Sequence, residues 1–187
     1  MLLKYPNSNK NYQKKVSHAN RGMSLEAIIN DANKYYLDNN IACIYKKHTP
    51  IGIVNVKENN GNKIITKAFF KEASTLDYNG VYKGCYIEFD AKQTLNKTSF
   101  PLSNISNHQL NHINNVISHK GIIFLIIEIN HQHYLIDGKQ LMTFINIEKR
   151  KSIPYDYFKK NCLEINYKNN ILDYLKSVDI LLGGNYE

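Results

Sequence analysis

Two aspartates and a lysine stand in an order that suits metal-assisted hydrolysis of a phosphodiester. Asp77 precedes residues that are typical of a turn, and Asp90 and Lys92 lie in the strand-like run that follows. A hard cation such as Mg²⁺ prefers carboxylate oxygens as ligands and makes a bound water more acidic, while a lysine offsets the negative charge that develops on a phosphate. These residues therefore form a candidate hydrolytic site.

The run from residue 85 to residue 92 must be extended for these side chains to act together. Successive side chains of a β-strand point to opposite faces of the sheet, so Glu88, Asp90 and Lys92 are expected on one face. The residues between them are apolar and are expected to pack on the other face. An acid, one further residue and a lysine also form ordinary surface salt bridges in basic proteins, so this pattern alone leaves both interpretations open.

A predicted helix brings another polar side chain toward this strand. Apolar residues recur at helical spacing from about Ser106 to His119, which predicts one buried face. Gln109 lies at the edge of that face and is expected to point toward the sheet, where metal, water or a strand carbonyl would satisfy its hydrogen bonds. A different face of the helix is expected to carry its histidines, His108, His112 and His119.

The charge balance favours a polyanionic partner. The 187 residues include 24 Lys and Arg against 16 Asp and Glu, a formal net charge of +8. Nucleic acid is the first expectation and an acidic membrane surface the second. The longest apolar run, residues 121–129, is too short to span a bilayer, and no signal peptide is indicated, so a soluble, cytoplasmic protein is expected. The cysteines form no CxxC pair, which argues against a zinc ribbon.

The pattern of apolar residues divides the chain into a polar arm and one domain. Residues 1–20 lack an apolar period and are expected to form a flexible basic arm, followed by a single domain over residues 21–184. The order of helix, strands, helix, strands and helices predicts an α/β fold with a mixed sheet flanked by helices. The first helix is expected from Ser24 to about Asn39, with Glu26 on the border of its apolar stripe.

A β-hairpin is expected over residues 52–70. Two strand-like runs flank the polar segment ENNGN, whose Asn60 and Gly61 suit a tight turn. Its lysines indicate either a basic finger that projects from the core or an ordinary sheet edge protected against aggregation. Candidate contacts to DNA phosphates are Lys57, Lys63 and Lys67 on this hairpin, Lys97 in a later loop, and Arg21 just before the first helix.

One long segment resembles the RecU family of Holliday junction resolvases. It reads ASTLDYNGVYKGCYIEFDAKQTLNKTSFPL and covers residues 73–102. The family pattern is T-x-D-Y-N-G-x-Y-K-G, followed by (D/E)-A-K and N-K-T-S-F-P-L. Features similar to the family also occur, in the same order, at NRGMSLEAIINDANKYYL, at HTPIGIVNV, at the pair His108 and Gln109, and at GIIFLII. The resemblance therefore extends over most of the chain.

This resemblance implies roles for individual residues. The metal ligands that it implies are Thr75, Asp77, Asp90 and Gln109. It makes Lys92 the residue that stabilises the transition state, and Asp77, Asp90 and Lys92 the catalytic set. The better-known family pattern has glutamate where this chain has Asp90, which keeps the ligand type but shortens the side chain by one methylene. Glu88 stands where the family also has an acid, and Glu88 and Glu26 are expected to support the metal ligands.

The resemblance also implies an activity and partners. The expected protein is an Mg²⁺-dependent endonuclease, with Mn²⁺ as a substitute, that resolves Holliday junctions by paired nicks during recombination, repair and chromosome segregation. A restriction-endonuclease-like fold is implied, with the hairpin as a stalk that enters the open centre of the junction. A homodimer is expected because two-fold symmetry places two sites on opposite strands. Recombinase and branch-migration proteins are further expected partners.

Other functions remain open from the residues alone. A restriction-type duplex endonuclease would share the metal site but not the preference for junctions. A catalytically inert protein that binds DNA or regulates a recombinase would keep the basic surface. A zinc protein would use His108 and His112, which are spaced i, i+4, but no glutamate follows His108 to complete HExxH.

Overall fold

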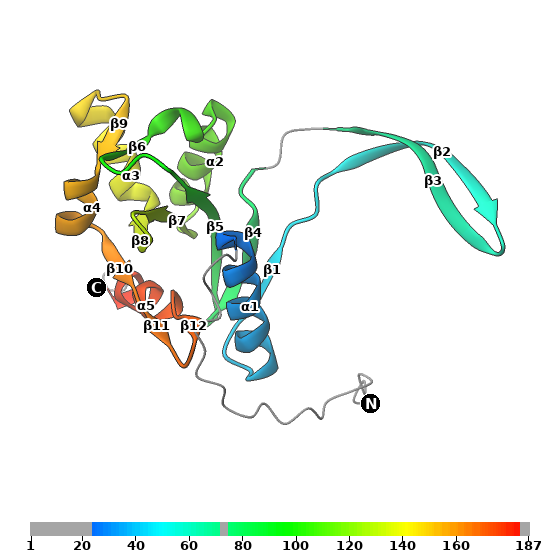
Figure 1. Ribbon diagram of the computed structural model, residues 1–187, viewed down its shortest axis with the longest axis horizontal. Coiled ribbons are helices and arrows are strands. Elements are labelled where there is room, and N and C mark those ends of the chain that lie inside the picture. Colours follow the sequence, from blue (N-terminus) through cyan, green and yellow to red (C-terminus); the bar gives the residue numbers. More distant parts are fainter. Residues whose placement is uncertain (1–23, 72–74, 184–187) are drawn as a thin grey trace.

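A six-stranded mixed sheet with helices on both faces forms the body of the protein (Figure 1). This computed structural model describes residues 24–71 and 75–183. The arm expected over residues 1–20 and the candidate phosphate contact Arg21 lie outside these ranges. The predicted α/β class, with a mixed sheet flanked by helices, is confirmed.

The central sheet has the strand order β1-β4-β5-β7-β8-β10. Its strands are β1 (Cys43–Lys46), β4 (Tyr78–Tyr82), β5 (Cys85–Gln93), β7 (Ile122–Ile129), β8 (Gln132–Asp137) and β10 (Leu163–Ile165). Strands β5 and β7 are parallel, and the other neighbouring pairs are antiparallel. A parallel pair needs a crossover connection. Helix α2 (Asn107–Ser118) lies in that connection and is thereby placed beside β5.

Two buried clusters cover the two faces of the sheet. One face packs against α1 (Leu25–Asp38) and α5 (Leu175–Gly183), and the other against α2, α3 (Gly138–Glu148) and α4 (Tyr155–Asn161). The predicted first helix matches α1, which begins after Ser24, whose Oγ accepts the N–H of Ala27 at 3.2 Å. No described helix is long and apolar enough to cross a membrane.

Strand β5 shows the alternation that the sequence predicts. Ile87 and Phe89 are fully buried in the cluster that contains α1. Glu88 and Asp90 pair in register with Ile123 and Leu125 of β7, which belong to the cluster on the α2 face. The two acids of β5 therefore point toward α2, and the apolar residues between them point away from it.

The remaining strands form small two-stranded sheets. They are β2 (Ile51–Asn59) with β3 (Asn62–Phe70), β6 (Ser99–Pro101) with β9 (Ser152–Pro154), and β11 (Tyr167–Lys168) with β12 (Ile171–Leu172). A short 3₁₀ helix, η1 (Leu102–Asn104), follows β6. The pairing of β6 with β9 joins the loop after β5 to the segment before α4.

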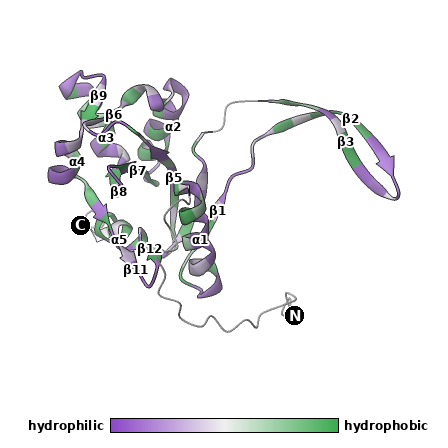
Figure 2. Ribbon diagram, viewed as in Figure 1, coloured by the Kyte–Doolittle hydropathy of each residue, from purple (hydrophilic) through white to green (hydrophobic). Residues whose placement is uncertain are grey.

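The hairpin of β2 and β3 extends away from the body (Figure 1). Asn60 and Gly61 both have positive φ, at 50° and 76°, which a tight turn of this kind requires. Gly52 is the one residue of the two strands that is buried. Apolar side chains along the arms are exposed, and the tip is polar (Figure 2).

Candidate active site

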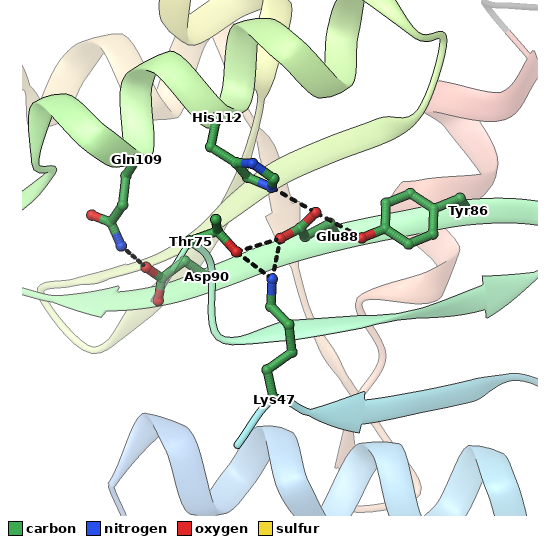
Figure 3. Close-up of polar contacts among 7 residues, drawn as sticks. All are labelled: Lys47, Thr75, Tyr86, Glu88, Asp90, Gln109 and His112. Carbon is green, nitrogen blue, oxygen red and sulfur yellow. Dashed lines mark hydrogen bonds and ion pairs between the residues drawn. The ribbon is translucent and has the colours of Figure 1, made fainter. Parts of the chain in front are cut away.

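Four of the candidate residues, Thr75, Glu88, Asp90 and Gln109, lie close together between β5 and the first part of α2 (Figure 3). Tyr78 is the last paired residue of β4 and lies opposite Phe89, so Asp77 and Asp90, the next residues on the two chains, lie at the same end of the ladder. The charge of Asp77 contributes to the raised pKa of the Asp90 carboxyl, which agrees with this placement. The register of β4 against β5 therefore unites two carboxylates that are separated by a turn in the sequence.

Asp90 is fully buried and is held by defined contacts. Its Oδ2 accepts a hydrogen bond from Gln109 Nε2 at 2.8 Å and lies 2.8 Å from the Lys92 ammonium. Its Oδ1 accepts the backbone N–H of Ala91 at 2.7 Å. Burial raises the pKa of the Asp90 carboxyl above its ordinary value, with a further rise from Asp77, although Lys92 lowers it. A bound cation would relieve this unfavourable ionisation.

Gln109 is oriented by the start of its own helix. Ser106 caps α2, its Oγ accepting the N–H of Gln109 at 3.2 Å, while Gln109 Oε1 accepts the N–H of Ser106 at 3.1 Å. This capping box satisfies free backbone groups at the helix terminus and fixes the glutamine side chain. Gln109 points toward the sheet, as expected, and its partner there is the carboxylate of Asp90.

Glu88 is equally buried, but every oxygen of its carboxylate is occupied (Figure 3). Oε1 accepts from the Lys47 ammonium and, at 3.3 Å, from the Thr75 hydroxyl. Oε2 accepts from the Tyr86 hydroxyl at 2.7 Å and lies 2.9 Å from His112 Nε2. These partners use the lone pairs that a carboxylate offers.

The partners of Glu88 keep it charged. Burial, the largest single influence, raises the pKa of the Glu88 carboxyl, but hydrogen bonds from Lys47, His112 and Tyr86 together outweigh burial and hold the pKa below its ordinary value. The four contacts leave no free lone pair on the Glu88 carboxylate among the described residues.

Lys47 was missed by the sequence reasoning. It follows β1, in a segment that reads only as a break between strands, yet its ammonium reaches both Glu88 and the Thr75 hydroxyl, the latter at 2.5 Å. Its backbone N–H donates to the carbonyl of Asp77 at 2.7 Å. Nothing local in the sequence signals these contacts, because they join segments that are far apart along the chain.

The expectation that His112 lies on a different helix face from Gln109 is wrong. Both side chains reach β5, Gln109 at Asp90 and His112 at Glu88. Residues spaced i, i+3 are neighbours on a helix surface, so this spacing was the available signal. His119, one turn and more further along, instead contacts the carbonyl of Asn115.

The other predicted residues lie apart from the carboxylates. Glu26 forms an ion pair with Lys46, and both side chains are substantially exposed. Lys97 lies in the loop after β5, where its carbonyl accepts from Asn130 Nδ2 at 2.7 Å. The hairpin lysines Lys57, Lys63 and Lys67 are exposed along β2 and β3.

The donor set suits a hard cation. Within the part of the chain that the structure describes, no group of at least three His, Cys, Asp or Glu side chains is placed to hold a metal ion. His112 Nε2 is engaged by Glu88, which removes one nitrogen of the zinc alternative. Within the described residues Asp90 Oδ1 accepts a single hydrogen bond, from the N–H of Ala91, so it keeps a lone pair for a cation. A metal held by Asp90 and Asp77 would need neutral oxygens and water to complete its shell, as Mg²⁺ does.

Two carboxylates and a lysine at the end of a mixed sheet are typical of metal-dependent nucleases with a D…(D/E)xK pattern. The model of the family described as RecU, Recombination protein U, matches residues 20–180. The chain therefore belongs to the RecU family, and the resemblance noted in the sequence is confirmed.

Relatives of known name agree with this membership. The Holliday junction resolvase RecU of Oceanobacillus iheyensis is 49% identical over 171 residues, covering 87% of this chain and 87% of that protein. The Holliday junction resolvase RecU of Bacillus mycoides is 43% identical over 196 residues, covering 96% of this chain and 98% of that protein. The Bacillus cereus protein of the same name matches equally.

Proposed function

We propose that this protein is a divalent-metal-dependent endonuclease that resolves four-way DNA junctions by paired nicks. The observation that carries the proposal is the meeting of Asp77, Asp90 and Lys92 at the end of β5, in a chain whose relatives are named Holliday junction resolvases. The fold that we propose is the restriction-endonuclease-like fold, in which a mixed sheet presents such a site.

The side chains divide the work of phosphodiester hydrolysis. Asp77 and Asp90 would hold Mg²⁺, or Mn²⁺ in its place, and such an ion would polarise the phosphate and make the attacking water more acidic. Thr75 and Gln109 would add neutral oxygens, and the Thr75 hydroxyl would have to serve the ion beside its contacts with Lys47 and Glu88. Lys92, 2.8 Å from Asp90, offsets the charge that grows on the phosphate oxygens in the transition state.

The shorter side chain of Asp90 is compatible with its proposed role as a metal ligand. Asp90 lies one methylene further back than the glutamate of the better-known family pattern, yet Gln109 and Lys92 both contact it directly. Gln109 presents its Nε2 to Asp90, so a role as a metal ligand would require its oxygen to turn toward the ion.

In this proposal the hairpin determines the preference for four-way junctions over duplex DNA. A four-way junction differs from duplex DNA in shape, so its recognition needs a protrusion and contacts to phosphates more than contacts to base edges. We propose that β2 and β3 form a stalk for the junction centre, with Lys57, Lys63 and Lys67 as its phosphate contacts and Lys97 and Arg21 as contacts elsewhere. A homodimer would place two active sites on opposite strands. Recombinase and branch-migration proteins are proposed partners.

The experiment compares cleavage of a four-way junction with cleavage of linear duplexes of the same sequences, with and without Mg²⁺. We expect paired nicks in the junction, only with the metal, and little cleavage of the duplexes. Asp77→Asn is expected to abolish nicking and to leave junction binding in metal-free buffer intact, whereas Asp38→Asn, on the exposed surface of α1, is the matched control. Equal rates on junction and duplex would support a restriction-type enzyme instead, and no nicking with any divalent ion would support an inert binding protein.

A further inference from the structure

Two separate hydrogen bonds join the segments on either side of the hairpin, one at the hairpin base and one beside the candidate active site. The N–H of Lys71 donates to the carbonyl of Pro50 at 3.1 Å, where the hairpin begins and ends. Closer to the sheet, the N–H of Lys47 donates to the carbonyl of Asp77 at 2.7 Å. Lys46 then pairs with Tyr78 in the ladder of β1 and β4. The segment that enters the hairpin is thus joined to the segment that leaves it.

The Lys47 side chain adds a second link at the same level. Its ammonium donates to the Thr75 hydroxyl at 2.5 Å and to the Glu88 carboxylate, and only about a quarter of the side chain is exposed. Lys47 lies before the hairpin and Thr75 after it, while Glu88 belongs to the central strand β5. One cation therefore binds both connections of the hairpin to the body (Figure 3).

Glu88 is itself anchored to the body. Its second oxygen is held by Tyr86 of the same strand and by His112 of α2. In the described residues, β2 and β3 form a ladder only with each other, so the hairpin gains no fixed position from the central sheet. The network around Glu88 ties the segments that lead into and out of the hairpin, at Lys47 and Thr75, to the strand that carries Asp90 and Lys92.

We propose that Lys47 and Glu88 are positioning residues that hold the hairpin at a fixed distance from the cleavage site, and so determine which phosphate is cut relative to the junction centre. The proposal rests on the proposed function, in which the hairpin occupies that centre. Successive phosphates of one DNA strand are spaced by about 3.4 Å along the helix axis. A shift of the hairpin base by that distance would move the cut by one nucleotide.

The test maps nick positions at nucleotide resolution on a static four-way junction with end-labelled strands. Lys47→Met removes the ammonium and keeps an unbranched apolar chain. We expect its nicks to spread to neighbouring phosphates, and turnover at saturating junction to fall by about 10- to 100-fold, as expected for a displaced reacting group. Junction affinity in metal-free buffer is expected to stay unchanged, because Lys47 is engaged inside the protein.

A neighbouring lysine provides the matched control. Lys46→Met removes the same charge one residue earlier, where the side chain pairs with the exposed Glu26. This variant is expected to cut at the positions, and at the rate, of the unmodified protein. The control separates the loss of a positive charge near the site from the loss of the link to Thr75 and Glu88.

A second variant guards against misfolding. Lys47→Met leaves the buried Glu88 carboxylate without its main counter-charge, which destabilises a folded protein. The double variant Lys47→Met with Glu88→Gln removes both charges, and thermal unfolding checks that it is folded. Its nicks are also expected to spread, because the link across the hairpin base is still absent.

The outcomes distinguish this proposal from the function on which it rests. Unchanged nick positions and turnover in both folded variants would overturn the positioning role and leave the proposed function standing. If the unmodified protein cuts no junction, the proposed function fails and the positioning role fails with it. Spread nicks in the Lys46→Met control would also overturn the proposal, since the effect would then follow charge alone.

Discussion

Glu88 and Asp90 lie two residues apart on the same face of β5, and both are buried, yet their surroundings are opposite. The donors around Glu88 outweigh burial and hold its pKa low. At Asp90, burial and the charge of Asp77 outweigh the contacts with Lys92, Gln109 and Ala91, and its pKa is raised. The difference teaches which acid is structural and which is available. We infer that Glu88, whose lone pairs are all used, organises the site, and that Asp90, whose ionisation is unfavourable, is the better candidate to bind a cation.

The largest expected difference between variants of the two acids is in how much added Mg²⁺ raises the free energy of unfolding. A ligand that binds only the folded protein, at about 100 times its Kd, adds about 2.7 kcal/mol to the free energy of unfolding. We expect this gain in the unmodified protein and in Glu88→Gln, and its loss in Asp90→Asn. Thermal unfolding across a Mg²⁺ titration measures it. An equal gain in Asp90→Asn would show that the metal binds elsewhere.

Glu88→Gln should lower the free energy of unfolding by about 1 to 3 kcal/mol, because a buried amide cannot satisfy all the donors that a carboxylate satisfies. Chemical unfolding in metal-free buffer measures the loss. Glu164→Gln, on the exposed side of β10, is the control and should have no measurable effect. Stability equal to that of the unmodified protein would mean that the network around Glu88 contributes nothing to folding.

In metal-free buffer, Asp90→Asn should raise the free energy of unfolding, whereas Glu88→Gln should lower it. A group whose folded-state pKa is raised contributes stability below its unfolded-state pKa and loses that contribution as the pH rises through the folded-state pKa. Ionised Asp90 therefore destabilises the metal-free protein near neutral pH. Asp90→Asn is expected to melt at a slightly higher temperature than the unmodified protein, and a lower melting temperature would contradict the assigned charge balance.

The smallest expected effect is the change with pH in the stability difference between the unmodified protein and Glu88→Gln. Glu88 has a lowered folded-state pKa, so its contribution to stability is complete above the unfolded-state pKa and disappears as the pH falls through the lower folded-state pKa. The difference in unfolding free energy between the unmodified protein and Glu88→Gln should therefore shrink in acid. A difference that stays constant down to strongly acidic pH would refute this linkage.

The sequence predicted the parts of this site that depend on local periodicity. The alternation along β5 placed Glu88 and Asp90 on one face, and the phase of α2 pointed Gln109 toward the sheet. These features need only the period of a strand or a helix.

Contacts between distant segments escaped prediction. Lys47 reaches Glu88 across 41 positions of sequence, from a segment whose path is determined by the ladder of β1 with β4. His112 was assigned to the wrong face, because a small error in helical phase moves a side chain at the edge of the apolar stripe. The separation of Glu88 from Asp90 into different roles depends on these contacts, so no strand pattern could reveal it.

The most direct measurement is the rate of Mg²⁺-dependent nicking of a four-way junction by Asp90→Asn and by Glu88→Gln, beside the unmodified protein. We predict that Asp90→Asn loses activity by about 100- to 1,000-fold, the usual cost of removing a group that acts in the transition state. Glu88→Gln should keep metal-dependent nicking at a reduced rate. Nicking by Asp90→Asn that equals or exceeds that of Glu88→Gln would contradict the assignment of the active site.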